Sequence, residues 1–283
     1  MVKKSRNKPA VTTLFADMEL RGGYKLKGLL GEGGFAQVWE ADSADGRKLA
    51  LKFIPCDRDL AAAKEVRSIQ AIRQLAHPHL IGVDQVWIDL GYIIVAMELA
   101  DGSLLDLWNR YQEEANTPIV PELVCEYLFQ AAEGLDFLNA HQHEVDGQRK
   151  GFQHCDIKPS NLLLVGQSIK ISDFGLSSTT GVSVKSHRRA GTLLYAAPET
   201  FQGRLSDWTD QYSLALSYCQ LRGGRLPFAA APSSFKEHYA RPDDLSMLTE
   251  PEQVIIGRAL LPVPQNRWPT CMEMMERLAG VFV

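Results

Sequence analysis

The chain has 283 residues, enough for one large domain or two smaller lobes. Hydrophobic residues make up 45% and charged residues 23%, close to the averages for globular proteins, which excludes a collagen-like or compositionally disordered chain. A formal net charge of -4 gives no basic excess that would favour an anionic partner. We therefore expect no nucleic-acid partner and no membrane contact from this segment.

The beginning of the chain and its cysteines bear on location. The 5 cysteines are widely spread and form no C-x-x-C pattern, which favours a reducing, cytoplasmic environment. No run approaches the roughly 18 to 20 consecutive apolar residues that a membrane span needs. The basic residues at the start could resemble the first part of a signal peptide, but Pro9, two threonines and Asp17 interrupt any apolar stretch that follows them. We expect residues 1–23 to form a flexible solvated tail.

From Tyr24 the sequence predicts a small antiparallel sheet with one helix. Alternating apolar residues and turn signals place the strands at 24–30, 37–41, 48–54, 83–88 and 92–98. Residues 61–75 have apolar side chains at helical spacing, and His77-Pro78 follows them. We expect this first lobe to end near the break at residues 100–102.

Beyond Gly102 the pattern is mainly helical. The predicted helices are 121–140, 207–221, 251–260 and 269–283. Loops dense in His, Asp, Lys, Asn and Gly lie between them. The fold class is therefore α+β, with a sheet-plus-helix N-lobe at 24–100 and a mainly α-helical C-lobe at 101–283. A cleft between two such lobes is a frequent place for a ligand.

A glycine cluster, Gly31-Glu32-Gly33-Gly34, lies between the first two predicted strands. Glycines let backbone N–H groups approach phosphate oxygens without obstruction by side chains. A tight hairpin explains the same cluster equally well. A Rossmann site is disfavoured, because its glycines stand between a strand and a helix, whereas here another strand follows.

Lys52 lies on the third predicted strand among apolar neighbours, where an unpaired ammonium group would be costly to bury. Glu65 is the only acidic residue of the predicted helix 61–75. We therefore expect a Lys52–Glu65 ion pair, with Lys52 also reaching ligand phosphates. The alternative is that both residues are ordinary surface charges.

The most specific pattern is His154-Cys155-Asp156-Ile157-Lys158-Pro159-Ser160-Asn161, followed after a short apolar strand by Asp173-Phe174-Gly175. An aspartate beside an acceptor hydroxyl can take its proton. An asparagine and a second aspartate offer hard oxygen ligands to Mg²⁺. These are the groups that phosphoryl transfer requires.

In this order and spacing, the motifs from Tyr24 to the C-terminus resemble the eukaryotic-type protein kinase family. The resemblance implies transfer of the γ-phosphoryl group of ATP with Mg²⁺, or with Mn²⁺ as a substitute ion. It makes Asp156 the catalytic base and Lys158 the residue that steadies the transferred phosphate. Asn161 and Asp173 become the metal ligands.

The resemblance also implies a nucleotide site and a kinase domain at 24–283. Its phosphate-covering loop contains Gly31, Gly33 and Gly34, with Lys52 as the strand lysine and Glu65 as its helix partner. The backbone of the hinge, residues 98–100, would meet adenine at Glu98 and Ala100. Val38, Ala50 and Leu163 would sandwich the adenine ring, and Met97 would guard the pocket behind the hinge.

Two positions indicate the substrate class. Lys158, two residues after the base, and Thr192, in the activation segment 173–199, resemble the serine/threonine branch of the family. We therefore expect protein substrates, with autophosphorylation in trans. The resemblance further implies an ion pair between Glu199 and Arg267, and a bracing role for Asp210 beneath the catalytic loop.

The sequence departs from the family pattern at three places. Cys155 replaces the usual arginine before the base, Ala36 replaces the third glycine, and residues 141–151 form a longer connection than usual. Because Cys155 supplies no positive charge to receive a phosphate, we expect basal activity without phosphorylation of the activation segment.

Two alternatives remain open. A pseudokinase would bind nucleotide as a scaffold, and retention of Lys52, Asp156, Asn161 and Asp173 argues against it. A small-molecule kinase shares the His-x-Asp pattern. The segment ending in Ala197-Pro198-Glu199, a peptide-docking shelf in protein kinases, favours a protein substrate instead.

Overall fold

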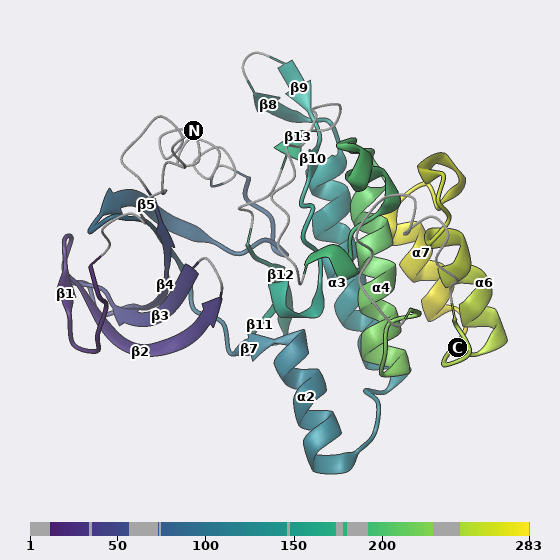
Figure 1. Cartoon of the computed structure of the whole chain (residues 1–283), viewed down its shortest axis with the longest axis horizontal. Helices are drawn as coiled ribbons and strands as arrows, with labels where there is room; N and C mark the ends of the chain where they lie inside the picture. The colour runs from purple at the N-terminus through teal and green to yellow at the C-terminus, as the bar shows by residue number, and fades with distance from the viewer. Residues whose placement is uncertain are drawn as a thin grey trace, which may run out of the picture. The chain divides into compact units, whose positions relative to one another are not determined.

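The computed structural model describes residues 12–33, 36–56, 73, 75–145, 148–173, 178–179, 192–228 and 244–282. The chain divides into two compact units, coloured by residue number in Figure 1. The first contains Met1–Ala76 and Ile81–Ala100, and the second contains His77–Leu80 and Asp101–Val283. The first unit thus ends at Ala100, and residues 77–80 belong to the second unit although residues 81–100 follow them in the sequence.

The first unit is built on a curled antiparallel sheet with the strand order β1-β2-β3-β4-β6-β5 (Figure 1). Its strands are β1 (Glu19–Leu20), β2 (Tyr24–Gly33), β3 (Ala36–Asp42), β4 (Lys48–Pro55), β5 (Val83–Asp89) and β6 (Tyr92–Glu98). All five predicted strands are present, within a few residues of their expected ends. The predicted helix 61–75 falls almost wholly outside the described residues.

One face of this sheet carries the core of the first unit. Alternate residues of the central strands point to it, because successive side chains of a strand face opposite ways. Leu51 and Phe53 of β4 and Ile94 and Ala96 of β6 are fully buried there, with Trp39 of β3 beside them. Residues that alternate with these, such as Ala50 and Lys52 of β4, face the opposite side of the sheet.

The segment before Tyr24 packs onto this core. The side chains of Leu14 and Leu20 are each only 8% exposed within the core cluster, and β1 pairs with β2. The hydroxyl of Tyr92 donates to the carbonyl of Thr12 at 3.0 Å. The expected flexible tail is therefore wrong for residues 12–23, because two leucines cover apolar sheet surface. Residues 1–11 lie outside the described part.

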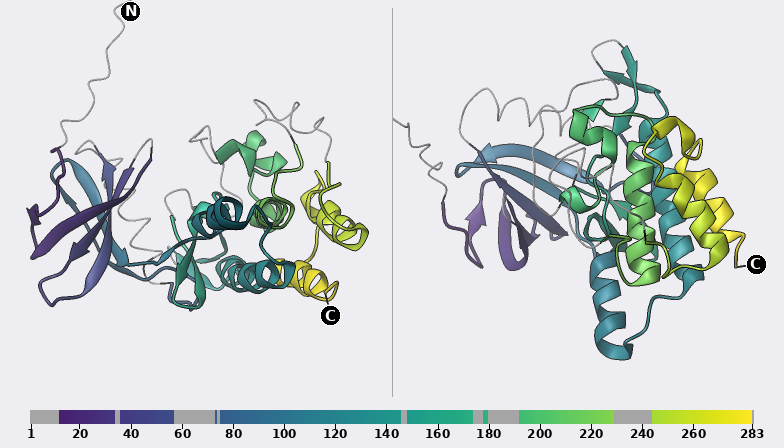
Figure 2. Two further views of the ribbon diagram at one scale, coloured as in Figure 1. Left: turned by 90° about the horizontal axis from the view of Figure 1, so that it is seen from below. Right: turned by 45° about the vertical axis from the view of Figure 1, so that its right-hand side comes forward.

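The second unit is mainly helical. Its helices are α2 (Leu104–Ala115), α3 (Pro121–Asn139), α4 (Thr209–Gly223), α6 (Glu250–Ala259) and α7 (Cys271–Ala279). Helix α3 packs against α4 and α7 (Figure 2). Helix α6 also packs against α4 and α7, on the side of these two helices that faces away from α3. The four predicted helices are confirmed. Helix α2 was missed, although Ser103 and Asp106 form a capping box at its start.

Short elements connect these helices. A three-stranded sheet, ordered β12-β11-β7, consists of β7 (Gly102–Ser103), β11 (Leu162–Val165) and β12 (Ser168–Ile171). Strand β10 (Phe152–Gln153) pairs with β13 (Ser178–Thr179). The long connection before the catalytic loop forms a hairpin of β8 (His143–Val145) and β9 (Gln148–Lys150). The 3₁₀ helices are η1 (Pro159–Asn161), η3 (Thr192–Leu194), η4 (Pro198–Gln202) and η5 (Pro264–Asn266).

Within the described ranges, none of the helices combines the length and the apolar character that crossing a lipid bilayer requires.

Candidate active site

The predicted catalytic loop runs from the end of β10 to the start of β11, and the first turn of α4 holds its beginning. The carboxylate of Asp210 accepts the backbone N–H of His154 at 2.5 Å and that of Cys155 at 2.8 Å. Asp210 is almost completely buried. Burial raises the pKa of its carboxyl above the ordinary value, while interactions with His154 and Cys155 oppose the rise. The expected bracing of the loop by Asp210 is confirmed.

Cys155 has a left-handed backbone with φ +66°, which is unfavourable for a residue with a side chain. The Asp210 carboxylate accepts hydrogen bonds from the N–H groups of both His154 and Cys155 and so holds this turn. The thiol of Cys155 donates to the carbonyl of Gln153 at 3.5 Å. The backbone conformation at Cys155 fixes the position of the next residue in the loop, Asp156.

Asp156 is buried and fixed by two neighbours. Lys158 Nζ lies 3.1 Å from each of its carboxylate oxygens. The amide Nδ2 of Asn161 donates to the Asp156 carbonyl at 2.7 Å and to Asp156 Oδ2 at 3.1 Å. Since both Nδ2 protons of Asn161 are used on Asp156, its carbonyl oxygen Oδ1 is the atom that remains for a metal ion.

His154 joins this loop to the segment that carries Asp173. Its Nδ1 accepts the N–H of Asp156 at 3.3 Å, so Nε2 must carry the proton donated to the carbonyl of Ser172 at 2.8 Å. Ser172 in turn donates its N–H to the carbonyl of Asn161 at 2.9 Å. Asn161 and Asp173 are therefore on backbone segments that are hydrogen-bonded to each other.

The oxygen donors of Asn161 and Asp173 suit a hard cation such as Mg²⁺. Mg²⁺ usually takes one or two protein carboxylates and completes its shell with water and substrate phosphates. Among the described residues, no cluster of three or more His, Cys, Asp or Glu side chains could hold a metal by itself. The oxygen donors of Asn161 and Asp173 are of the type that hard divalent cations accept.

In the first unit, four predicted nucleotide-site residues share one face of the sheet. Val38 on β3 is the register partner of Lys52 on β4, and Ala50 is that of Met97 on β6. Residues 50 and 52 face the same way, as cross-strand partners do. This face is opposite the one that carries the buried core residue Leu51.

The glycines of β2 lie across from β3 on the same sheet. Gly31 pairs with Val38, and Gly33 pairs with Ala36. A Cβ atom added at Gly31 would meet nothing within 4 Å, so packing does not require glycine there. Ala36 lies in the extended backbone of β3, which alanine adopts without strain, and this explains how it can replace a glycine. Gly34 lies outside the described residues.

The remaining predicted residues are distributed as follows. Glu98 ends β6, and its N–H donates to the carbonyl of Gly82 at 2.9 Å. Ala100 is the last residue of the first unit. Leu163 belongs to β11 of the second unit, and Thr192 begins η3. Glu65 lies outside the described residues, so its expected ion pair with Lys52 stays a prediction.

The end of the activation segment is anchored as expected. Arg267 Nη1 and Nη2 contact the two carboxylate oxygens of Glu199 at 2.9 and 2.8 Å. The Arg267 side chain is 0% exposed and that of Glu199 9%. The predicted buried ion pair between Glu199 and Arg267 is confirmed.

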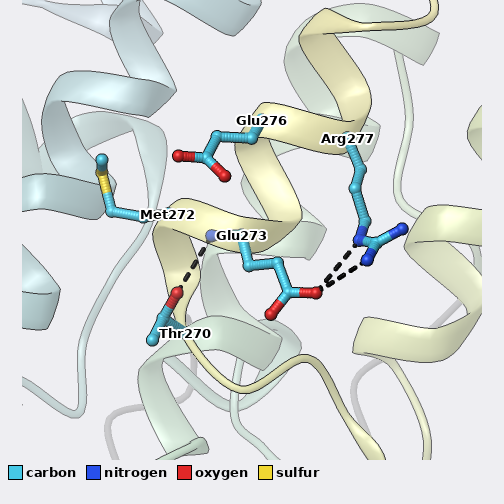
Figure 3. A pocket seen from close by; sticks show the side chains of 5 residues that line it. All are labelled: Thr270, Met272, Glu273, Glu276 and Arg277. Carbon is cyan, nitrogen blue, oxygen red and sulfur yellow. Dashed lines mark hydrogen bonds and ion pairs between the residues drawn. The ribbon is translucent and has the colours of Figure 1, made fainter.

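A separate pocket lies at the start of α7 (Figure 3). Its lining residues are Thr270, Met272, Glu273, Glu276 and Arg277. Glu273 is already engaged there, because it contacts Arg277 at 2.8 Å and its N–H donates to Thr270 at 3.0 Å. None of the predicted catalytic residues lines this pocket. We assign the candidate active site to the catalytic loop because Asp156, Lys158 and Asn161 contact one another there.

Comparison with known proteins agrees with this assignment. A family model described as "Protein kinase domain" matches residues 24–279. The chain is 31% identical over 263 residues to CBL-interacting protein kinase 4 of Oryza sativa subsp. japonica, covering 88% of this chain and 55% of that protein. It is 29% identical over 281 residues to the serine/threonine-protein kinase PknJ of Mycobacterium tuberculosis, covering 92% of this chain and 45% of that protein.

A third relative, the SNF1-like protein kinase ssp2 of Schizosaccharomyces pombe, is 31% identical over 266 residues, covering 87% of this chain and 42% of that protein. The chain thus spans about half the length of these curated relatives. The matched region includes every motif on which the candidate site depends. The chain belongs to the protein kinase domain family, whose members use ATP and a divalent metal ion to phosphorylate proteins.

Proposed function

We propose that the protein is a serine/threonine kinase that transfers the γ-phosphoryl group of ATP to hydroxyl groups of proteins. The observation that carries this proposal is the arrangement around Asp156, a buried carboxylate fixed by Lys158 and Asn161. The names of the relatives, which include serine/threonine-protein kinases, support the acceptor class. Lys158 and Thr192 support the same class.

Asp156 acts as the base in this proposal. As the acceptor oxygen forms its bond to the γ-phosphorus, its proton passes to the Asp156 carboxylate, the bond to the β-phosphate oxygen breaks, and ADP leaves. Asp156 Oδ2 accepts hydrogen bonds from both Asn161 Nδ2 and Lys158 Nζ, whereas Oδ1 is contacted by Lys158 Nζ. Oδ1 therefore keeps more acceptor capacity for that proton. In this proposal the ammonium group of Lys158, which lies 3.1 Å from Asp156 Oδ1, would also contact the transferred phosphoryl oxygens.

Asn161 and Asp173 would hold the metal ion, for which we propose Mg²⁺, with Mn²⁺ as a substitute. When bound, the ion neutralises charge on the phosphate oxygens. The protein's own part is to keep the two oxygen donors in register, which the Ser172 to Asn161 hydrogen bond supports.

On the first unit, we propose that Lys52 contacts ATP phosphates and that Glu65 is its partner. Gly31, Gly33 and Gly34 would let backbone N–H groups approach the same phosphates. The shared sheet face supports an adenine contact through three apolar residues of this unit. The full proposed adenine set is Val38, Ala50, Met97 and Leu163, with the backbones of Glu98 and Ala100.

The proposed setting is the cytoplasm. All 5 cysteines are thiols, and four of them are buried, which suits a reducing compartment. We also propose autophosphorylation in trans and no nucleic-acid partner.

The test of the nucleotide and metal assignments is to change Lys52→Met and Asp173→Asn. Each variant should remain folded and lose phosphoryl transfer by about 10² to 10⁴ fold, the range for losing a positioned base or an electrostatic clamp. Asp173→Asn should also weaken ATP binding in the presence of Mg²⁺. Asp244→Asn is the matched control, because the Asp244 side chain is 58% exposed.

The same assay separates the alternatives. A protein kinase labels protein hydroxyls from ATP, a small-molecule kinase labels only small hydroxyl compounds, and a pseudokinase binds ATP without labelling either. Full transfer by both Lys52→Met and Asp173→Asn would overturn the proposed roles of these residues.

A further inference from the structure

Gln153 is the residue directly before the catalytic loop, and its side-chain amide is buried with only 1% of the residue exposed. Its Oε1 accepts the backbone N–H of Asp210 at 3.1 Å, and its Nε2 donates to Asn139 Oδ1 at 2.8 Å. Leucine would fill a similar volume but would leave the Asp210 N–H and the Asn139 Oδ1 without these partners. The amide therefore contributes hydrogen bonds to specific partners rather than bulk.

Residues 153–155 and Asp210, in the first turn of α4, bind each other in both directions. The Asp210 carboxylate binds the backbone of His154 and Cys155, while the Gln153 side chain binds the backbone of Asp210. The N–H groups of a helix's first turn need acceptors from outside the helix. Trp208, at the N-cap of α4, provides no side-chain cap, so Gln153 supplies an acceptor from a distant segment.

The other end of the amide is anchored to α3. Asn139 is the last residue of this helix, and its Nδ2 donates to the carbonyl of Asp207 at 2.9 Å. A Cβ atom added at Gly151 would lie only 2.9 Å from the carbonyl oxygen of Asn139, so the chain returns very close to the helix end. The β8–β9 hairpin is thus closed at its base by the Asn139–Gln153 contact.

We propose that Gln153 is a positioning residue for Asp156. Its amide fixes the first turn of α4, the Asp210 carboxylate then holds the left-handed turn at Cys155, and this turn directs Asp156 at the acceptor hydroxyl. The inference rests on the proposed function, in which Asp156 is the base. Replacing the neutral Gln153 removes no charge and no proposed nucleotide contact, so the KM for ATP should stay nearly unchanged. Because the replacement disturbs the position of the base, kcat should fall.

The experiment compares Gln153→Leu with Gln142→Leu, the same change at an exposed glutamine of the same connection. Both are assayed well below their unfolding temperatures. Gln153→Leu should lower kcat about tenfold, corresponding to ~1.4 kcal/mol of barrier. The KM for ATP should stay within about twofold, and Gln142→Leu should match the wild type. A kcat within about twofold of wild type, or an equal loss in Gln142→Leu, would overturn the inference.

Asn139→Ala is the second variant, and it serves alone if Gln153→Leu does not fold. It removes the anchor of Gln153, and with it the bond from Asn139 to the carbonyl of Asp207, but keeps the Gln153–Asp210 bond. We expect kcat to fall about threefold, an effect of ~0.7 kcal/mol. The double variant should lose no more than Gln153→Leu, because the two side chains act as one unit. Additive losses, or an unchanged kcat for Asn139→Ala, would contradict this coupling.

Two further readouts separate positioning from mere stability and from the function itself. Amide hydrogen exchange at His154 and Cys155 should be faster in Gln153→Leu and unchanged in Gln142→Leu, and equal rates in both would overturn the inference. Asp156→Asn is assayed alongside. If Asp156→Asn is inactive while Gln153→Leu is normal, only the inference fails. If Asp156→Asn is active, the proposed base fails.

Discussion

Replacing Arg267 with alanine should destabilise the second unit strongly. Four hydrogen bonds hold its guanidinium group: two to the Glu199 carboxylate, one to the carbonyl of Trp208 and one to that of Leu261. The Arg267→Ala change leaves the Glu199 carboxylate buried, where it still accepts from the hydroxyls of Thr209 and Ser206, the remaining side-chain partners among the described residues.

The magnitude follows from this burial. Removing one partner of a buried ion pair costs about 3 to 5 kcal/mol, because it strands a charge out of water. In a domain of this size, each kcal/mol lowers the melting temperature by about 2 to 4 °C. We therefore expect Arg267→Ala to melt roughly 6 to 20 °C below the wild type in differential scanning calorimetry.

Arg225→Ala is the matched control. Arg225 contacts Asp244 at 2.6 Å, but both side chains are about half exposed, so the pair should contribute less than about 1 kcal/mol. A second check is the double variant Glu199→Gln with Arg267→Met, which removes both charges and should lose less stability than the two single losses added together. An Arg267→Ala melting temperature no lower than that of Arg225→Ala would refute the reasoning.

Three other predictions concern the start of the chain, acid stability and regulation. Leu14→Ala should lower the unfolding free energy by about 2 to 4 kcal/mol, because Leu14 is buried. Phe15→Ala, at a neighbour that is 59% exposed, should lower it by less than about 0.5 kcal/mol. Equal effects of the two changes in urea denaturation would support the flexible tail that the sequence predicted. Burial disfavours the charged form of Glu252, but hydrogen bonds from Thr249 and Tyr218 outweigh it and lower its pKa. The stabilisation is therefore complete above the ordinary pKa of 4.5 and is lost as pH falls through the lowered value, so Glu252→Gln should flatten the fall of melting temperature between about pH 5 and pH 3; parallel curves would contradict this. Because Cys155 brings no charge, phosphatase treatment, or alanine at the six hydroxyl residues of segment 177–189, should leave activity within about tenfold of untreated enzyme. A larger loss would show that the segment is a switch. The hydroxyl residues to be changed are Ser177, Ser178, Thr179, Thr180, Ser183 and Ser186.

The motif of the proposed catalytic loop could be recognised in the sequence because its residues stand close together. Asp156, Lys158 and Asn161 lie within six consecutive positions, and their mutual hydrogen bonds need only the 3₁₀ turn that Pro159 begins. The strands of the first unit were also predictable, since their alternation is strong and each is bounded by turn residues.

What the sequence did not reveal depends on contacts between distant residues. Leu14 and Leu20 form no periodic pattern of their own, and only the folded sheet provides the surface that buries them. Gln153 stands 57 positions before its partner Asp210, so no local pattern indicates that its amide is needed. The capping box of α2 was a local signal and could have been recognised from Ser103 and Asp106.

The most direct test of the proposed function is transfer of labelled γ-phosphate from ATP to serine and threonine of a generic protein, by wild type and Asp156→Asn. Asparagine keeps the size of the side chain and removes its ability to take a proton. The wild type should label serine and threonine. Asp156→Asn should be about 10² to 10⁴ fold slower, with ATP affinity within about threefold and Asp244→Asn unchanged. Transfer by Asp156→Asn within about threefold of wild type would contradict the assignment of Asp156 as the base.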